Sequence, residues 1–210
     1  MIVLLGGQKG GTGKSNIAVN LAVYNAIKGK SVLLVDGNSK QGTCSNWAER
    51  REVSELTSVS CIEKQGSLHK TLLDLSDKYD EIIVDTGGQD SKEFRTSLTA
   101  ADVLVSPMSP SQSDIETIVY LNDLVDEAKE YNPELEAKVV FSKVRPHHVK
   151  SKIPDNRELI NDNTDLKVMG ALVYLREIYV DASPGGHGVL ELNDKKAKLE
   201  IEALAKEIYG

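Results

Sequence analysis

The sequence predicts an α/β fold in which a doubly wound, mostly parallel sheet has helices on both faces. Short β-branched runs alternate with longer segments that have the apolar spacing of helices, and this alternation is typical of βαβ units. The runs are apolar throughout, as in parallel strands that are buried on both sides. The predicted strands are 2–5, 32–36, 58–62, 81–85, 102–106, 138–142 and 167–173.

Helices are expected between these strands and at the end of the chain. The segment 15–30 follows the first strand, and a later helix ends before an Asn-Pro pair. The apolar positions of that later helix are Ile115, Ile118, Leu121, Val125 and Ala128. A final surface helix over 194–210 is expected to pack through a stripe of Leu199, Ile201, Leu204 and Ile208. No repeat, low-complexity segment or linker divides the chain, so residues 1–210 are predicted to form one domain.

The bulk composition bounds the compartment and the cysteine chemistry. The 210 residues carry a formal net charge of −7 and contain no apolar run of membrane-spanning length. The N-terminal segment lacks the charged region and the cleavage site of a signal peptide, so we expect a cytoplasmic protein. Cys44 and Cys61 have neither the number for a disulfide framework nor metal-ligand spacing, and both are expected to be reduced packing residues.

The stretch 6-GGQKGGTGKS-15 has the composition of a phosphate-binding loop. Between a strand and a helix, glycines let successive N–H groups turn toward an anion, and the helix dipole adds to the attraction. Lys14 would then reach the β- and γ-phosphates, and the Ser15 hydroxyl would ligate Mg²⁺. The strict pattern G-x-x-x-x-G-K-[ST] fails at Gln8, whereas K-G-G-x-G-K-[ST] matches with an additional lysine at Lys9. The predicted nucleotide-binding residues are Lys9, Gly10, Gly11, Thr12, Gly13, Lys14, Ser15 and Asn16.

With this second lysine, the sequence resembles the deviant Walker A family of P-loop NTPases. That family includes ParA-type plasmid partition proteins, MinD-type cell-division regulators and the nitrogenase iron protein. The resemblance implies that Lys9 reaches across a dimer interface to the phosphates of the partner's ATP, where a second ammonium group offsets several phosphate charges. It also implies ATP or ADP and Mg²⁺ as cofactors, an ATP-dependent homodimer, and catalytic roles for Lys9, Lys14 and Asp36.

Two aspartates at predicted strand ends extend the resemblance. The segment 81-EIIVDTGG-88 is similar to a Walker B strand, in which Asp85 would hold a water on Mg²⁺ and the glycine pair would sense the γ-phosphate. Asp36 ends an earlier strand, where the family uses this residue near the hydration shell of Mg²⁺. The metal site is therefore expected to include Ser15, Asp36 and Asp85. The alternative for Asp85 is a strand-end aspartate that only caps a turn.

The sequence departs from the family after the second strand. The family usually reads D-x-D-P-Q there, and the second carboxylate helps to position the attacking water, whereas this chain reads 36-DGNSKQGT-43. The equivalent residue is Asn38 or Ser39, depending on the anchor used for the alignment, and neither is a carboxylate. Loss of a group that orients water typically slows a reaction by about 10²- to 10⁴-fold, so a weak Mg²⁺-dependent ATPase is predicted.

The resemblance is strongest to small ParA proteins without an N-terminal DNA-binding domain, such as ParF. The shared features are an early phosphate-binding loop, 45-SNW-47, 105-VSPMSPSQSD-114 and 174-YLREIYVDA-182. Within the proline-bearing loop, Ser113 or Asp114 is a candidate cap of the following helix. The subgroup implies a switch in which an ATP-bound dimer, or a polymer, positions plasmid DNA together with a small centromere-binding partner protein.

A basic stretch between Lys138 and Lys152 is the candidate for DNA contact. It contains five basic residues and two histidines but no carboxylate. We expect nonspecific contact with DNA phosphates in the ATP-bound state, which would place the protein on the nucleoid. The alternative is a solvated edge beside an acidic helix. The predicted DNA-binding residues are Lys143, Arg145, Lys150 and Lys152, to which Lys195, Lys196 and Lys198 are possible additions.

Other functions of this fold fit the residues less well. A membrane-surface regulator of the MinD type would need a basic, bulky amphipathic tail, whereas the final helix carries Glu200, Glu202 and Glu207 and neither Trp nor Phe. A metabolic ligase of the dethiobiotin synthetase type has no use for Lys9. An iron–sulfur reductase would place cysteines after the Walker B strand, where this chain has none.

Overall fold

The structure is a computed structural model of the chain. It describes residues 1–38, 42–88, 90–111 and 116–210. Four residues with a predicted role lie outside these ranges: Ser39, Ser113, Asp114 and Ile115.

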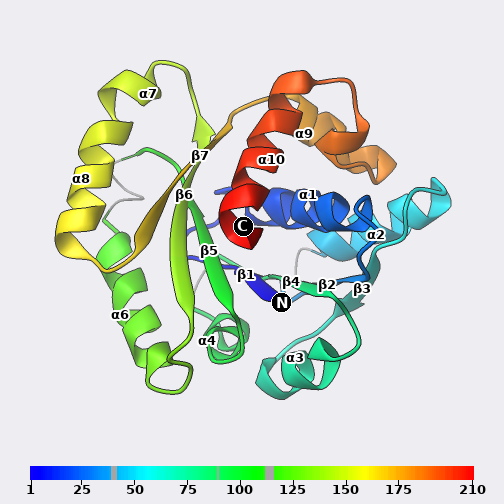
Figure 1. The fold of residues 1–210 in the computed structure, drawn as a ribbon, viewed down its shortest axis with the longest axis horizontal. Coiled ribbons are helices and arrows are strands. Elements are labelled where there is room, and N and C mark those ends of the chain that lie inside the picture. The colour runs from blue at the N-terminus through cyan, green and yellow to red at the C-terminus, as the bar shows by residue number, and fades with distance from the viewer. Residues whose placement is uncertain (39–41, 89, 112–115) are drawn as a thin grey trace.

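Seven strands form one sheet in the order β3-β2-β4-β1-β5-β6-β7 (Figure 1). Every pair of neighbouring strands is parallel, which confirms the predicted α/β class. Hydrogen bonding extends β6 beyond the predicted run at both ends, because β6 pairs with β5 and with β7. The strands are β1 (Ile2–Leu5), β2 (Val32–Asp36), β3 (Ser60–Glu63), β4 (Glu81–Asp85), β5 (Val103–Met108), β6 (Glu136–Val144) and β7 (Lys167–Tyr174).

Helices cover both faces of the sheet, as Figure 1 shows. None of those in the described ranges is long and apolar enough to cross a membrane. The longer helices are α1 (Lys14–Ala26), α2 (Thr43–Val53), α3 (His69–Ser76), α4 (Lys92–Leu98), α6 (Ile118–Lys129), α8 (Ile153–Asn163) and α10 (Lys195–Tyr209). The short ones are α7 (His148–Ser151), α9 (Ile178–Asp181), η1 (Ser183–Gly185) and η2 (Val189–Glu191).

The core consists of two apolar clusters, one on each face of the sheet. Successive residues of β1 point to opposite faces, so Ile2 and Leu4 join the cluster under α3, α4, α6 and α8. Val3 and Leu5 join the second cluster, under α1, α2 and α10. Because all four of these side chains are buried, the strand is apolar throughout, and the sequence pattern has this physical origin.

Two predictions about the helices need correction. α1 ends at Ala26 instead of at residue 30, because the chain turns through Gly29, whose φ is 81°. In α10, Leu199 is 65% exposed and does not belong to the packed stripe. It lies two residues from both Ala197 and Ile201, which are buried, and residues two apart point to different sides of a helix. Glu200 is buried in its place.

Candidate functional site

The P-loop is the turn between β1 and α1. Gly11 and Gly13 have φ values of 74° and 95°, in the left-handed region that favours glycine. A Cβ added at either residue would meet no atom within 4 Å, so the backbone conformation, and not space, requires glycine there. Gly13 is also the residue that precedes α1, so the helix N-terminus opens directly onto this turn.

The side chain of Lys14, the first residue of α1, folds back onto the P-loop. Its ammonium donates a hydrogen bond to the carbonyl of Lys9 at 2.7 Å, and the residue is 6% exposed. Burial lowers the pKa of Lys14, partly offset by the charge of Asp85. A buried cation of this kind is ready to receive a phosphate, whose charge would replace the lost hydration. Lys9 is half-buried at the edge of the same loop.

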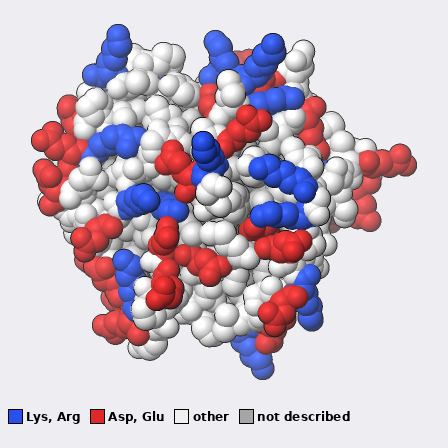
Figure 2. All heavy atoms as spheres, in the orientation of Figure 1, with Lys and Arg blue, Asp and Glu red and all other residues white. Residues whose placement is uncertain are grey.

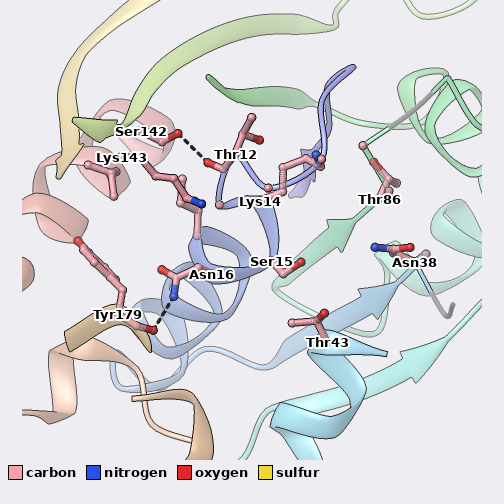
Figure 3. A pocket seen from close by; sticks show the side chains of 18 of the residues that line it. Thr12, Lys14, Ser15, Asn16, Asn38, Thr43, Thr86, Ser142, Lys143 and Tyr179 are labelled. Atoms are coloured by element: carbon pink, nitrogen blue, oxygen red, sulfur yellow. Dashed lines mark hydrogen bonds between the residues drawn. The ribbon is translucent and has the colours of Figure 1, made fainter. Parts of the chain in front are cut away.

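The P-loop is one wall of a cavity of about 740 Å³ at the carboxyl edge of the sheet (Figure 3). Asn38 and Thr86 lie on one side of the P-loop, and Ser142, Lys143 and Tyr179 lie on the other. Parallel sheets bind ligands at this edge, outside the carboxyl ends of their strands. The predicted nucleotide-binding residues from Gly10 to Asn16 all line the cavity.

The loop after β4 touches the P-loop. A Cβ added at Gly88 would lie 2.3 Å from the backbone nitrogen of Gly10 and 2.5 Å from the carbonyl carbon of Lys9. The two loops therefore approach so closely that any side chain at this position would displace one of them.

The two predicted carboxylates lie side by side, because Asp36 and Asp85 are register partners on β2 and β4. Both are fully buried. Asp36 accepts hydrogen bonds from the backbone nitrogens of Asn38, Cys44 and Ser45 at 3.0–3.1 Å, so it caps the N-terminus of α2. Asp36 thus ties the loop after β2 to the strand, and any contact with the hydration shell of Mg²⁺ comes in addition to this task.

Asp85 is less well satisfied. Its Oδ2 accepts a hydrogen bond from the thiol of Cys44 at 3.3 Å, whereas Oδ1 is buried and has no partner among the described residues. Burial raises the pKa of Asp85 to about 6, and the nearby hydroxyl of Ser15 and thiol of Cys44 partly offset this rise. Burial also raises the pKa of Cys44 well above its ordinary value, so this residue is a neutral thiol and a donor.

These groups fit Mg²⁺ held together with phosphates. In the described ranges, no group of three His, Cys, Asp or Glu side chains could hold a metal ion by itself. Magnesium bound with a nucleotide typically uses one or two carboxylates, phosphate oxygens and waters. Two buried oxygens at the P-loop lack partners within the described part of the chain, Thr12 Oγ1 and Asp85 Oδ1, which suits an arriving ion with its waters.

The residue in place of the second carboxylate faces the cavity. Asn38 lines it, and a Cβ added at Gly87 would lie 3.5 Å from the Asn38 Oδ1. The amide is therefore next to the loop after β4, where it can still hydrogen-bond a water but cannot take its proton. Ser39, the other possible equivalent, lies outside the described residues.

The side of the cavity away from Asn38 holds residues to which the sequence analysis gave no role in nucleotide binding. Lys143 and Tyr179 lie on this side, and Leu175, Arg176 and Val180 also line the cavity. Lys143 has a φ of 51°, which is uncommon for a residue with a side chain and is often found at functional sites. The Asn16 side chain donates to the carbonyl of Tyr179 at 2.8 Å and so joins this wall to α1. Lys143 comes from β6, whereas the other four belong to the segment 174-YLREIYVDA-182, which carries the family resemblance but no spacing typical of a ligand site.

The predicted DNA-binding residues fall into two places. Arg145, Lys150 and Lys152 are exposed in and around α7, whereas Lys143 is exposed within the lining of the cavity. Figure 2 shows lysine and arginine side chains over α7, on a face where positive and negative residues are otherwise mixed. Lys138 is not part of this surface, because it is 6% exposed and pairs with Glu136 at 2.9 Å.

Comparison with known proteins identifies the family. A family model described as the CobQ/CobB/MinD/ParA nucleotide binding domain matches residues 3–186. The chain belongs to this family. The predicted ParA-type P-loop ATPase is thereby confirmed at the level of the family, and ATP binding and hydrolysis are the general activity that ParA/MinD membership supports.

Curated relatives of this ParA/MinD-family protein include a ParA protein and a protein named for carboxysome distribution. Protein ParA of Rhizobium radiobacter is 30% identical over 147 residues, which are 69% of this chain and 65% of that protein. Maintenance of carboxysome distribution protein A of Gloeobacter kilaueensis is 37% identical over 120 residues, which are 57% of this chain and 53% of that protein. The alignments thus span about two thirds and about half of these two relatives.

Solved structures of the ParA/MinD family share the fold over nearly the whole chain. The MinD cell division protein of Aquifex aeolicus has a TM-score of 0.78 at 18% identity, covering 99% of this chain and 96% of its own. MinD of Pyrococcus horikoshii, complexed with Mg-ADP, has a TM-score of 0.78 at 17% identity, and the match covers 99% of this chain and 95% of that protein. A putative plasmid partition protein of Borrelia burgdorferi bound to AMPPNP has a TM-score of 0.72 at 21% identity and covers 99% and 97%.

Asp85→Asn is expected to stabilise the nucleotide-free protein at neutral pH. The pKa of Asp85 is raised from 3.8 to about 6. The folded protein therefore keeps the proton of this carboxyl group over a pH range in which the unfolded chain has lost it. The stability contributed by Asp85 is therefore highest below about pH 4 and falls as the pH rises to about 6. Above that, the buried negative charge costs roughly 2–3 kcal/mol, which the neutral amide avoids.

Urea unfolding of the parent and of Asp85→Asn between pH 4 and pH 8 measures this effect. The difference in free energy of unfolding should grow between pH 4 and 6 and stay level above. Asp123→Asn, at an exposed position on α6, is the matched control and should show little difference at any pH. A difference for Asp85→Asn that does not change with pH would contradict the raised pKa.

Proposed function

We propose that this protein is an ATP-driven switch that positions plasmid DNA with the help of a small DNA-binding partner protein. In this proposal ATP closes a homodimer, the dimer or a polymer of it binds DNA nonspecifically, and hydrolysis stimulated by the partner reverses both steps. The observation that carries the proposal is the P-loop with two lysines, Lys14 inside the loop and Lys9 at its edge. A metabolic P-loop enzyme needs only the first of them.

The cargo class rests on the relatives. Plasmid DNA is favoured by the similarity to Protein ParA of Rhizobium radiobacter and to the Borrelia plasmid partition protein. The 37% identity to a carboxysome distribution protein supports a second candidate within the same mechanism, an ATPase that positions a protein-based cargo. In both cases the ATP-bound form would sit on the nucleoid in the cytoplasm.

Each residue of the site has a role in this proposal. The backbone from Gly10 to Gly13 cradles the phosphates, and Lys14 neutralises them. Ser15 and Asp85 hold Mg²⁺, and Asp36 orients the loop next to it. When bound, Mg²⁺ would supply charge neutralisation at the β- and γ-phosphates. Asn38 orients water without acting as a base, so hydrolysis by the protein alone is expected to be slow.

Lys9→Ala is expected to abolish ATP-dependent dimerisation while ADP binding by the monomer remains. The reason is that Lys9 would act on the partner's nucleotide, so its loss removes an intersubunit charge pair and leaves the monomer's own cradle intact. Light scattering gives the molar mass with ADP and with ATP plus Mg²⁺, and phosphate release is followed on the same samples.

The parent protein is the control for this experiment. A parent dimer with ATP and a Lys9→Ala monomer support the switch. Dimerisation that survives Lys9→Ala contradicts the role of Lys9 across the interface. A parent that stays monomeric with both nucleotides points instead to a metabolic enzyme of the same fold.

Lys150→Ala combined with Lys152→Ala is expected to weaken DNA binding by the ATP-bound form. Both lysines are exposed, and each phosphate contact contributes about 0.9 to the slope of log K against log salt. When binding of a DNA duplex is measured at 50–200 mM salt, the slope of log K against log salt should therefore be smaller in magnitude by about 1–2. Affinity should fall by the same factor for unrelated DNA sequences. The charge-matched control is Lys70→Ala combined with Lys78→Ala. Both of these lysines are exposed in or just after α3, away from α7. An unchanged slope would show that the region around α7 does not contact DNA.

A further inference from the structure

Cys44 contacts both aspartates that end the strands beside the P-loop. It is the second residue of α2 and is completely buried. Its thiol lies 3.3 Å from Oδ2 of Asp85, and its backbone N–H donates to Oδ2 of Asp36 at 3.0 Å. A single residue therefore links the helix that Asp36 caps to the carboxyl group on the neighbouring strand.

The thiol contact leaves the two oxygens of Asp85 in different states. Oδ2 is occupied by Cys44, whereas Oδ1 is buried and lacks a partner in the described part of the chain. A carboxyl group with one oxygen held in this way has a defined orientation, in which the other oxygen is the one available to an incoming ligand. Hydrogen bonds to ligating carboxylates commonly set metal affinity in this manner.

We propose that Cys44 is a positioning residue that orients Asp85 toward the Mg²⁺ of the bound nucleotide. The inference rests on the function proposed above, in which Asp85 serves the metal site. Cys44 does not touch the nucleotide or the ion. It acts through the S–H···O contact with Asp85, and its place in the first turn of α2 fixes that contact to the loop after β2, which carries Asn38.

A role in packing alone would have different consequences. Cys44 belongs to the apolar cluster under α1, α2 and α10, so its removal would cost some stability in either case. A packing role would not distinguish nucleotide with metal from nucleotide without metal. Positioning of Asp85 would, because only the metal-bound complex uses the orientation of its carboxyl group.

The test compares ADP affinity with Mg²⁺ and with EDTA by calorimetry, using the full chain. The ratio of the two dissociation constants measures the coupling between metal and nucleotide, without any hydrolysis. For Cys44→Ala we expect this ratio to fall by about 10-fold, while the affinity in EDTA changes by less than about 2-fold. Cys44→Ser keeps a donor in place and should restore the ratio to within about 3-fold of the parent.

Two further variants separate the possible failures. Cys61→Ala, at the half-buried second cysteine, is the matched control and should leave the ratio unchanged. Asp85→Asn should lower the ratio at least as much as Cys44→Ala.

A folded Cys44→Ala protein with the parent ratio, or with equal losses in Mg²⁺ and in EDTA, overturns the positioning role while the metal role of Asp85 stands. If Mg²⁺ has no effect on the parent or if Asp85→Asn keeps the ratio, the metal role of Asp85 is wrong and the inference falls with it. If the parent does not bind ADP, the proposed function itself fails.

Discussion

Arg51→Ala is expected to lower the free energy of unfolding by about 3–5 kcal/mol. Arg51 lies on α2, is 1% exposed and pairs with Glu191 through two hydrogen bonds of 2.7 and 2.9 Å. Its other hydrogen bonds go to the carbonyls of Thr57 and Gly186, at 2.7 and 2.9 Å. Alanine would leave the half-buried Glu191 carboxylate without its counter-charge and two carbonyls without a donor, and a desolvated charge that loses its partner is costly.

The neighbouring residue provides the control for this variant. Arg50 donates to the carbonyl of Ser183 at 3.0 Å but is only half-buried, so Arg50→Ala should cost about 1 kcal/mol. Urea unfolding followed by circular dichroism measures both variants at pH 7. Equal losses in free energy of unfolding for the two variants would contradict the larger contribution expected of the Arg51–Glu191 pair.

The consequences of this pair extend to the cavity. Trp47 donates from Nε1 to the carbonyl of His187 at 3.0 Å, so α2 holds the segment after α9 at several points. The start of α2 supplies Thr43 to one wall of the cavity, and α9 supplies Tyr179 to the opposite wall. The contacts of α2 with the segment after α9 thus join two elements that both supply residues to the cavity.

Lys14→Ala is expected to weaken the binding of ADP and ATP by at least about 30-fold. Removal of one partner from a desolvated charge pair typically costs about 2–5 kcal/mol, and 1.4 kcal/mol corresponds to a factor of ten. The fold should persist without nucleotide, because the lowered pKa of Lys14 means that its buried charge destabilises the empty protein.

Calorimetric titration with each nucleotide and thermal unfolding without nucleotide test this prediction together. Lys70→Ala, at an exposed position on α3, serves as the control and should bind normally. A Lys14→Ala protein that binds within about 3-fold of the parent would show that this lysine does not contact the phosphates. A protein that unfolds at a much lower temperature would show that the lysine serves the fold instead.

Features set by local patterns could be predicted from the sequence. The seven strands and the α/β class follow from short apolar runs, because a parallel strand covered on both faces must be apolar along its whole length. The P-loop follows from glycines at positive φ between a strand and a helix. In both cases the determining residues are neighbours in the chain, so their spacing reveals the structure.

Features that depend on distant partners could not be predicted in this way. Lys138 belongs to the basic stretch of the sequence, but it is buried, and its ammonium donates to the carbonyl of Glu207 on α10. Glu200 is one of three glutamates that argue against a membrane-binding tail, but the structure shows that it is buried and accepts hydrogen bonds from Arg176 and the Tyr179 hydroxyl. In each case a charged side chain is buried because another segment supplies its partner, and composition does not reveal that segment.

The sequence by itself determined the fold class, the P-loop with its two lysines, and the absence of the second carboxylate, whether Asn38 or Ser39 takes its place. Only the tertiary structure decided which side chains meet: the thiol of Cys44 with Asp85, Arg51 with Glu191 across 140 residues, and Lys143 with the cavity instead of the exposed residues around α7. The physical reason is the range of the interactions. Backbone conformation and strand burial are read from adjacent residues, whereas hydrogen bonds and ion pairs in the interior depend on how the sheet brings remote segments together.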